Sequence, residues 1–458
     1  MIQPVNLPDE GGDMSEQRNR SLRGPLVAIL TAMLAVWSGS ATAASDQEVQ
    51  QLEARVAELE ALVRQLANGQ NTQRQELATV ESRTATVEQK VTEVVDDEPW
   101  NDYQFGGYVK FDTFVSKYND GSVSEDNLMR QFYVPSLVPV DAPDKDAQVD
   151  MQARETRVNF KSRHELPNGK EVKTLLEMDF FTGSEGDERI SNSYQPRLRH
   201  ALISYDGWDV GQTWSTFQNL GAFVENLDFI GPTEGTIFVR QALVRYTTGP
   251  WQFALENPES TITPFGGGSR INSDDNLLPD FVARYNWTGD WGHIAFAGLL
   301  RQLNIEDTDQ DLDEDEIGYG LSVSGKFNVF EKDDIRWMVN YGDGIGRYLA
   351  LNAANGAVLD EGGSLETIEQ MAGYVSYRHF WTGSWRSNFT VGGLSIDNDD
   401  SLTGGGVNKE HYSVHVNLLF DPIPKMTVGA EFMYASRELE NGLDGDMTRF
   451  IVSAKYAY

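Results

Sequence analysis

The sequence predicts an all-β, transmembrane, antiparallel β-barrel of about sixteen strands, preceded by an α-helical coiled coil. The first observation is a turn motif that recurs with an aromatic residue on either side: YTTGPW at residues 246–251, WTGDW at 287–291 and WTGSW at 381–385. Glycine supplies the positive φ of a tight hairpin. Paired Trp and Tyr rings are most stable at a membrane–water interface. The motif therefore indicates membrane hairpins, because repeated exposed Trp would be a liability in a soluble β-protein.

The second observation is an alternation of short and long connections from residue 101 to residue 458. The short ones lie at residues 166–170, 205–208, 246–251, 287–291, 330–334, 381–385 and 420–425. The long polar ones lie at residues 119–152, 182–196, 215–235, 258–279, 306–316, 344–369, 398–410 and 438–445. Outer-membrane barrels show this asymmetry, with tight periplasmic turns and long extracellular loops. The range 101–458 is therefore predicted to be a porin-like barrel domain.

The third observation is a period of two within the predicted strands. Residues 411–420 place Tyr412, Val414, Val416 and Leu418 on one face. The last strand places Phe450, Val452, Ala454, Tyr456 and the terminal Tyr458 on one face, with polar and basic residues between them. Such alternation is expected where one face meets lipid and the other meets a wet interior.

Residues 1–43 are predicted to be a leader that contains a secretory signal peptide. Arg18, Arg20 and Arg23 precede an apolar run at residues 25–37, and small residues follow at 41–43. A charged segment, a short apolar segment and a small-residue cleavage site define such a signal. We expect translation to start at Met14, because the acidic segment before it does not suit an export signal.

Residues 45–97 are predicted to form a periplasmic coiled coil. Their heptad core positions are Val49, Leu52, Val56, Leu59, Val63, Leu66, Gln70, Gln73, Leu77, Val80, Thr84, Val87, Val91 and Val94. A seven-residue repeat kept in register specifies a left-handed supercoil. The alternative, a single amphipathic helix on a globular surface, would drift out of this register.

Composition excludes several classes of function. The chain has no cysteine, which excludes disulfides and thiolate chemistry, and its net charge of −33 argues against a nucleic-acid partner. We predict no cofactor and no metal site. The acidic run at residues 306–316 has the spaced aspartates of a calcium loop, but Leu312 stands where such a loop requires glycine. A solvated surface loop is the favoured interpretation, with divalent bridging to lipopolysaccharide as the alternative.

No catalytic motif stands in a suitable context, so the chain is predicted not to be an enzyme. In the predicted strands, cationic side chains alternate with the apolar ones and so lie on the opposite face. That face is expected to be the interior one, because an arginine that faces lipid costs several kcal/mol. The predicted pore-lining and solute-binding residues are Arg157, Lys161, Arg197, Arg199, Arg284 and Arg386.

Residues 215–235 are predicted to fold inward and to narrow the pore. Their apolar content is high for a free surface loop. The predicted constriction residues are Phe217, Glu225, Asp228 and Glu234. Carboxylates facing arginines would give a transverse field that sorts solutes by charge.

Five segments resemble the DcaP-like porins of Gram-negative bacteria. These segments are FGGYVKFD at residues 105–112, RETRVNF at 154–160, LLEMDF at 175–180, RLRHA at 197–201 and VGQTWSTF at 210–217. The resemblance, which includes the coiled coil, implies a homotrimer in the outer membrane, surrounded by lipid and lipopolysaccharide. It also implies passive uptake of small anions, dicarboxylates in particular. The alternative function is a structural anchor whose coiled coil tethers a periplasmic partner or peptidoglycan.

Overall fold

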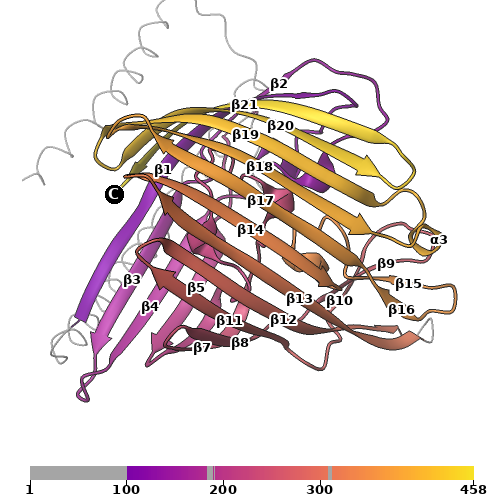
Figure 1. The fold of residues 1–458 in the computed structure, drawn as a ribbon, viewed down its shortest axis with the longest axis horizontal. Helices are drawn as coiled ribbons and strands as arrows, with labels where there is room; N and C mark the ends of the chain where they lie inside the picture. Colours follow the sequence, from indigo (N-terminus) through magenta and orange to yellow (C-terminus); the bar gives the residue numbers. More distant parts are fainter. Residues whose placement is uncertain (1–100, 183–188, 190, 308–311) are drawn as a thin grey trace, which may run out of the picture. The chain divides into compact units, whose positions relative to one another are not determined.

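The computed structural model describes residues 101–182, 189, 191–307 and 312–458. The predicted signal peptide, the start at Met14 and the predicted coiled coil lie outside these residues and stay predictions. The described residues belong to one compact unit, which comprises residues Glu98–Tyr458. They form an antiparallel barrel of 16 strands, as the sequence predicts (Figure 1).

The strands of the barrel follow the chain around the wall, each paired with the strands before and after it. They are β1 (Asn101–Tyr118), β3 (Arg157–Glu165), β4 (Glu171–Asp179), β5 (Arg197–Tyr205), β6 (Trp208–Trp214), β7 (Arg240–Thr248), β8 (Trp251–Glu256), β11 (Asp280–Gly289), β12 (Gly292–Asp307), β13 (Leu312–Val329), β14 (Asp333–Asp343), β17 (Glu369–Phe380), β18 (Trp385–Asp397), β19 (Asn408–Ile423), β20 (Met426–Leu439) and β21 (Asp444–Ala457). The barrel closes because β1 pairs with β21 as well as with β3.

The remaining elements lie in the long connections. Strand β2 (Gln148–Gln152) adds to β1, and a separate four-stranded sheet contains β9 (Ser260–Thr263), β10 (Ile271–Ser273), β15 (Ala357–Leu359) and β16 (Leu365–Thr367). The only α-helix in the described ranges is α3 (Asp400–Thr403). Among those residues no helix is long and apolar enough to cross a membrane.

The strands alternate between outward and interior side chains. On β1, Phe105, Val109 and Phe111 are exposed, whereas Lys110 and Asp112 are buried. An exposed apolar row along a barrel strand is stable only against lipid. The interior holds the polar residues of the opposite phase.

The predicted turns agree with the structure, but two of the predicted long connections do not. Residues 438–445 form a tight turn, because Glu438 of β20 pairs with Asp444 of β21. The second difference lies at residues 306–316. There β12 and β13 continue as a ladder in which Glu306 pairs with Asp313 and Asp307 with Leu312. Packing explains the difference, because Leu303 and Ile305 form an apolar cluster with members of the four-stranded sheet. The predicted free surface loop is therefore largely a hairpin extended beyond the barrel.

Candidate functional site

The connection between β6 and β7, residues 215–239, folds into the barrel interior, in agreement with the prediction from its apolar content. We call it the inward loop. It contains the short 3-10 helices η3 (Leu220–Ala222) and η4 (Thr233–Gly235). Its side chains are buried over residues 215–219 and 230–237.

Side chains from the wall hold the backbone of the inward loop. Two amide side chains donate to the carbonyl of Glu225: Asn388 Nδ2 at 3.0 Å and Asn417 Nδ2 at 2.9 Å. Further donors are Tyr374 to Ala222 O, Asn340 to Gly235 O and Lys110 to Leu227 O, each at 2.9 Å. These bonds come from β18, β19, β17, β14 and β1. The loop therefore needs little regular structure of its own, because the wall satisfies its carbonyl groups.

The carboxylate of Glu225 lies between two arginines of the wall. Arg386 Nε donates to it at 2.9 Å and Arg378 Nη1 at 3.2 Å. Burial alone would raise the pKa of Glu225, but the hydrogen bonds and charge of Arg386, with the charge of Arg378, outweigh burial and the pKa lies below its ordinary value. The structure thus brings predicted residues Glu225 and Arg386 together as a structural pair, and Arg386 also binds Asp421 at 2.6 Å.

The other predicted constriction residues are buried in contacts with the wall or with neighbouring loops. Asp228 accepts from the backbone N–H of Tyr133 at 3.0 Å and pairs with Arg449 at 3.3 Å. Glu234 accepts from Ser413 Oγ at 2.5 Å. Phe217 is 1 % exposed and meets Tyr348 edge to face at 5.9 Å. None of these three side chains faces open space; they fix the position of the loop.

A second group of arginines lies on β3 and β5. Arg197 binds Asp179 through two parallel hydrogen bonds of 2.8 Å. Arg199 bridges two carboxylates: its Nε donates to Glu177 at 2.8 Å and its Nη1 donates to Asp179 at 2.7 Å. Arg199 is only 1 % exposed. Arg157 reaches Glu177 at 3.7 Å. Arg157 and Arg197 are therefore partly open to the interior, whereas Arg199 holds the two carboxylates in place.

An irregularity in the β4–β5 ladder explains this grouping. The register shifts between Glu177 and Met178, so that His200 and Leu198 face them and Arg199 is the extra residue. A bulge of this kind lets two consecutive side chains lie on the same side of a strand. His200 Nδ1 lies 2.9 Å from Thr213 Oγ1, and Arg199 contacts the adjacent Trp214.

Arg240, at the start of β7, was missed by the sequence analysis. Its guanidinium carbon lies 4.8 Å from the ring centroid of Trp214, and that of Arg199 lies 5.6 Å from the same ring. Within the described part of the chain, Arg240 has no ion pair or hydrogen bond from its side chain. Ala242 and Val244 are exposed on the outward face of β7, and strict alternation would place Arg240 on that same face. Alternation could therefore not have identified Arg240 as an interior residue.

Aromatic rings surround this arginine group. Trp214 packs on Phe238 at 4.8 Å, Phe238 on Phe229 at 5.6 Å, and Phe229 on Phe181 at 4.6 Å. Arginine over an aromatic face is favourable and leaves its N–H groups free for other partners. We call Arg157, Arg197, Arg199 and Arg240, with these rings, the arginine–aromatic wall.

The two remaining predicted residues lie apart from one another. Lys161 on β3 is exposed, and its side chain bonds to none of the residues that the structure describes. Arg284 on β11 donates to the carbonyl of Gln218 in the inward loop and to Gln252. Arg378 is also absent from the predicted residues, although it follows Tyr374 and Ser376 in the interior phase of β17 and could have been found from that signal.

Cations are in excess along the arginine–aromatic wall. Asp179 and Glu177 are its carboxylates, and three guanidinium groups share them. In the described part of the chain, no carboxylate pairs with Arg240 or with Lys455, whose ammonium group lies 5.4 Å from the ring of Tyr108. Over the described ranges no cluster of three or more His, Cys, Asp or Glu could hold a metal ion.

A closed barrel with a lipid-facing apolar surface, a polar interior and an inward-folded third loop defines a porin-like outer-membrane channel. The sequence matches the family model of the DcaP outer membrane protein over residues 62–458. The chain therefore belongs to the DcaP outer membrane protein family and to the outer membrane.

Of two similar solved structures, the first shares the fold of the barrel. The outer membrane channel DcaP of Acinetobacter baumannii has a TM-score of 0.66 and 22 % sequence identity, with 78 % of this chain and 97 % of that chain covered. OmpF of Salmonella typhi, in complex with daunomycin, has a TM-score of 0.48 and 10 % identity over 78 % of this chain and 98 % of that one. No curated protein matches the sequence.

Proposed function

We propose that this channel is a porin for the passive diffusion of small anions, with dicarboxylates as the preferred class. The observation that supports the proposal is the excess of cations on the arginine–aromatic wall, above all Arg240, whose guanidinium group pairs with no carboxylate among the described residues. Arginine offers a planar fork that binds a carboxylate with two hydrogen bonds. A dianion moving along the wall would exchange one such contact for the next.

The net charge of −33 does not oppose this preference. Many of the acids lie in exposed segments such as residues 313–316, at the start of β13. Exposed charges more than about 8 Å apart are largely screened at physiological ionic strength. Cations inside a narrowed interior act at shorter range and at lower effective dielectric, so they dominate the field on a solute there.

Reversal potentials in planar bilayers under a salt gradient test the proposal. The variant Arg240→Ser/Lys161→Ser removes two cations that pair with no carboxylate of the residues that the structure describes. We expect wild type to select anions and the variant to move toward cation selectivity, with slower entry of succinate. Lys145→Ser/Lys170→Ser is the matched control, because it removes the same charge from exposed connections. Equal shifts in both variants would contradict an interior anion path.

The same recordings distinguish a channel from the anchoring alternative. An anchor whose barrel is closed by the inward loop would give no conductance steps in wild type. Conductance in wild type that follows the predicted selectivity would exclude the purely structural role.

We further propose that residues 45–97 form a periplasmic coiled coil and that the channel is a homotrimer. The support is the unbroken heptad of the sequence and membership of the family. Valine and leucine at core positions allow two or three strands, so composition alone does not decide the number. Mass measurement in detergent, with and without residues 45–97, tests this: a monomer in both preparations would exclude the trimer.

A further inference from the structure

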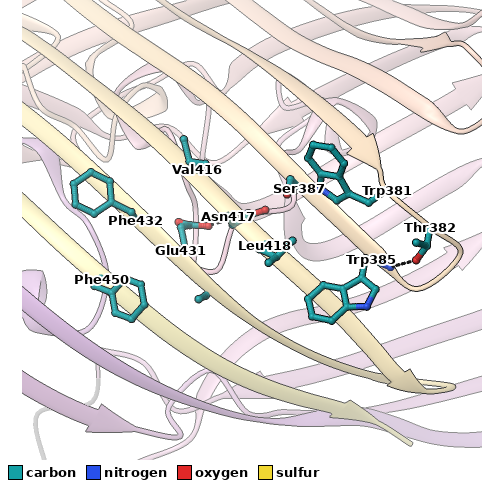
Figure 2. A pocket seen from close by; sticks show the side chains of 11 residues that line it. Trp381, Thr382, Trp385, Ser387, Val416, Asn417, Leu418, Glu431, Phe432 and Phe450 are labelled. Carbon is teal, nitrogen blue, oxygen red and sulfur yellow. Dashed lines mark hydrogen bonds between the residues drawn. The ribbon is translucent and has the colours of Figure 1, made fainter.

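The outward face of the barrel contains a hollow across β18, β19, β20 and β21. Its volume is about 560 Å³. Figure 2 shows Trp381 and Trp385 at one end of it and Phe432 and Phe450 at the other. The outward-facing Val416 and Leu418 lie between them. The hollow therefore opens toward the membrane and not toward the interior of the channel.

Two small residues among large ones produce the hollow. Ser387 on β18 and Ala430 on β20 have the outward phase, and Ala430 pairs with Leu418 of the strand between them. Phe432 and Phe450, which pair with each other, are 50 % and 46 % exposed. A small side chain beside such rings leaves a depression that none of the described residues fills.

The ladder between β18 and β19 is interrupted at the same place. Arg386 pairs with Leu419 and Phe389 with Val416, but the two positions between them do not pair. The side chain of Asn417 takes the place of a backbone acceptor, because its Oδ1 accepts the backbone N–H of Asn388 at 2.8 Å. The register is the same on both sides, so the strands separate locally without a slip.

The polar groups of Trp381 and Ser387 at the mouth of the hollow satisfy each other. Trp381 Nε1 donates to Ser387 Oγ at 2.9 Å, which fixes the indole over that serine (Figure 2). Trp385 stacks on Phe420 with ring centroids 4.4 Å apart. What remains exposed at the mouth is largely hydrocarbon, so the occupant that suits it is a flexible alkyl chain.

We propose that this hollow binds one acyl chain of a phospholipid of the surrounding membrane. The position of the hollow indicates its occupant, because the hollow opens on the apolar outward face of the barrel and begins at the Trp381–Trp385 turn. Tryptophan side chains favour the level of lipid headgroups, so the headgroup lies beside that turn and the chain extends along Leu418 and Phe432. The proposal concerns the outer surface and does not depend on which solute the channel conducts.

The floor of the hollow adjoins the contacts that hold the inward loop. Asn417 and Glu431 line it from the interior side. Asn417 donates to Glu225 O at 2.9 Å, and Glu431 accepts the backbone N–H of Leu227 at 2.6 Å. A chain in the hollow therefore contacts the same side chains that position the loop.

Retention of lipid after extraction tests the proposal. Ala430→Phe fills the hollow with a ring, and Ala242→Phe places the same ring at an exposed outward position on β7. The protein is reconstituted with phosphatidylethanolamine and phosphatidylglycerol and is then extracted again with detergent. Native mass spectrometry measures the mass of the protein together with any lipid that stays bound. We expect wild type and Ala242→Phe to retain one phospholipid per chain that Ala430→Phe loses. Equal retention in all three would overturn the proposal.

A labelled thiol identifies the occupant independently. The chain has no cysteine, so Ala430→Cys provides a unique site for a bimane label or a cross-linker. Brominated phospholipid should quench the label at position 430 at least twofold more than a label at Ala242→Cys. Efficient cross-linking between copies through position 430, without such quenching, would show that a second copy covers the hollow and would refute lipid binding.

Discussion

The guanidinium groups of β17 and β18 hold the inward loop, whereas those of β3, β5 and β7 are partly left to the interior. Arg378 and Arg386 both bind Glu225. Arg240 lies over Trp214 without any carboxylate among the described residues. Arginine therefore has two roles in the barrel interior. An arginine that pairs with a carboxylate of the inward loop holds the loop, whereas the others are partly open to the interior. We call the first group the loop-holding wall, to set it against the arginine–aromatic wall.

Because of this difference, the number of interior arginines does not show which of them are open to a solute. Arg386 has the interior phase expected of a pore-lining residue, yet its donors go to Glu225 and Asp421. An arginine with all its donors engaged contributes little to a passing solute. We therefore expect substitutions around the inward loop to lower stability, and substitutions on the arginine–aromatic wall to lower selectivity.

The largest effect is expected from Phe217→Ala. Phe217 is buried in the cluster that includes Met338 of β14 and Tyr374 of β17. Removing a buried phenyl ring costs about 3–5 kcal/mol. Urea unfolding in lipid vesicles should show this loss, and channel recordings should become noisier as the loop loosens. Phe265→Ala, at a ring that is 47 % exposed, is the control and should leave both unchanged.

A smaller loss of stability is expected from Arg386→Ala. Breaking a fully buried pair costs about 3–5 kcal/mol, but the side chain of Glu225 is 31 % exposed, so we expect about 1–3 kcal/mol. A double-mutant cycle with Glu225→Ala measures the coupling between them. Independent, additive effects of the two changes would mean that this pair does not hold the loop.

Arg240→Ser should change selectivity with little change in stability. Its contact with Trp214 contributes only about 0.5–1 kcal/mol. Anion preference, measured as a reversal potential, should fall more than it does for Arg386→Ala. If Arg386→Ala had the larger effect on selectivity, the distinction between the two walls would be wrong.

The smallest effect concerns pH. Because the pKa of Glu225 is lowered, its pairing contributes stability that is present above the unfolded pKa and is lost as pH falls through the lower, folded pKa. We expect the conductance of wild type to stay constant while ordinary exposed carboxylates protonate near pH 4–5. Glu225→Gln should show altered conductance already at neutral pH and no further change on acidification. A wild-type transition within that range would contradict the lowered pKa.

Much of the barrel could be predicted because its signals are local. Turns such as residues 381–385 are encoded by neighbouring residues, and the alternation of Val414, Val416 and Leu418 follows from a period of two. The inward fold of the loop was signalled by its apolar content. These features need no knowledge of which strands meet across the barrel.

The partners of the interior side chains could not be predicted in the same way. Glu225 and Arg386 are 161 residues apart in the chain, and no local pattern pairs them. The bulge at Arg199 and the position of Arg240 both break the alternation on which the assignment rested. The interior site depends on local departures from regular strands, and these departures are set by packing.

The contacts of the inward loop also determine when the loop is finally fixed inside the barrel. Lys110 near the N-terminal end of the barrel and Glu431 near its C-terminal end both bind Leu227. Contacts of such long sequence separation form late, because the intervening chain must first be brought together. The wall strands that fix the loop also include β19, β20 and β21, at the C-terminal end of the chain. Contacts with β14, β17 and β18 can form before these strands join β1, but the set of contacts is complete only when the barrel closes. Closure of the cylinder and final fixation of the loop therefore become one event.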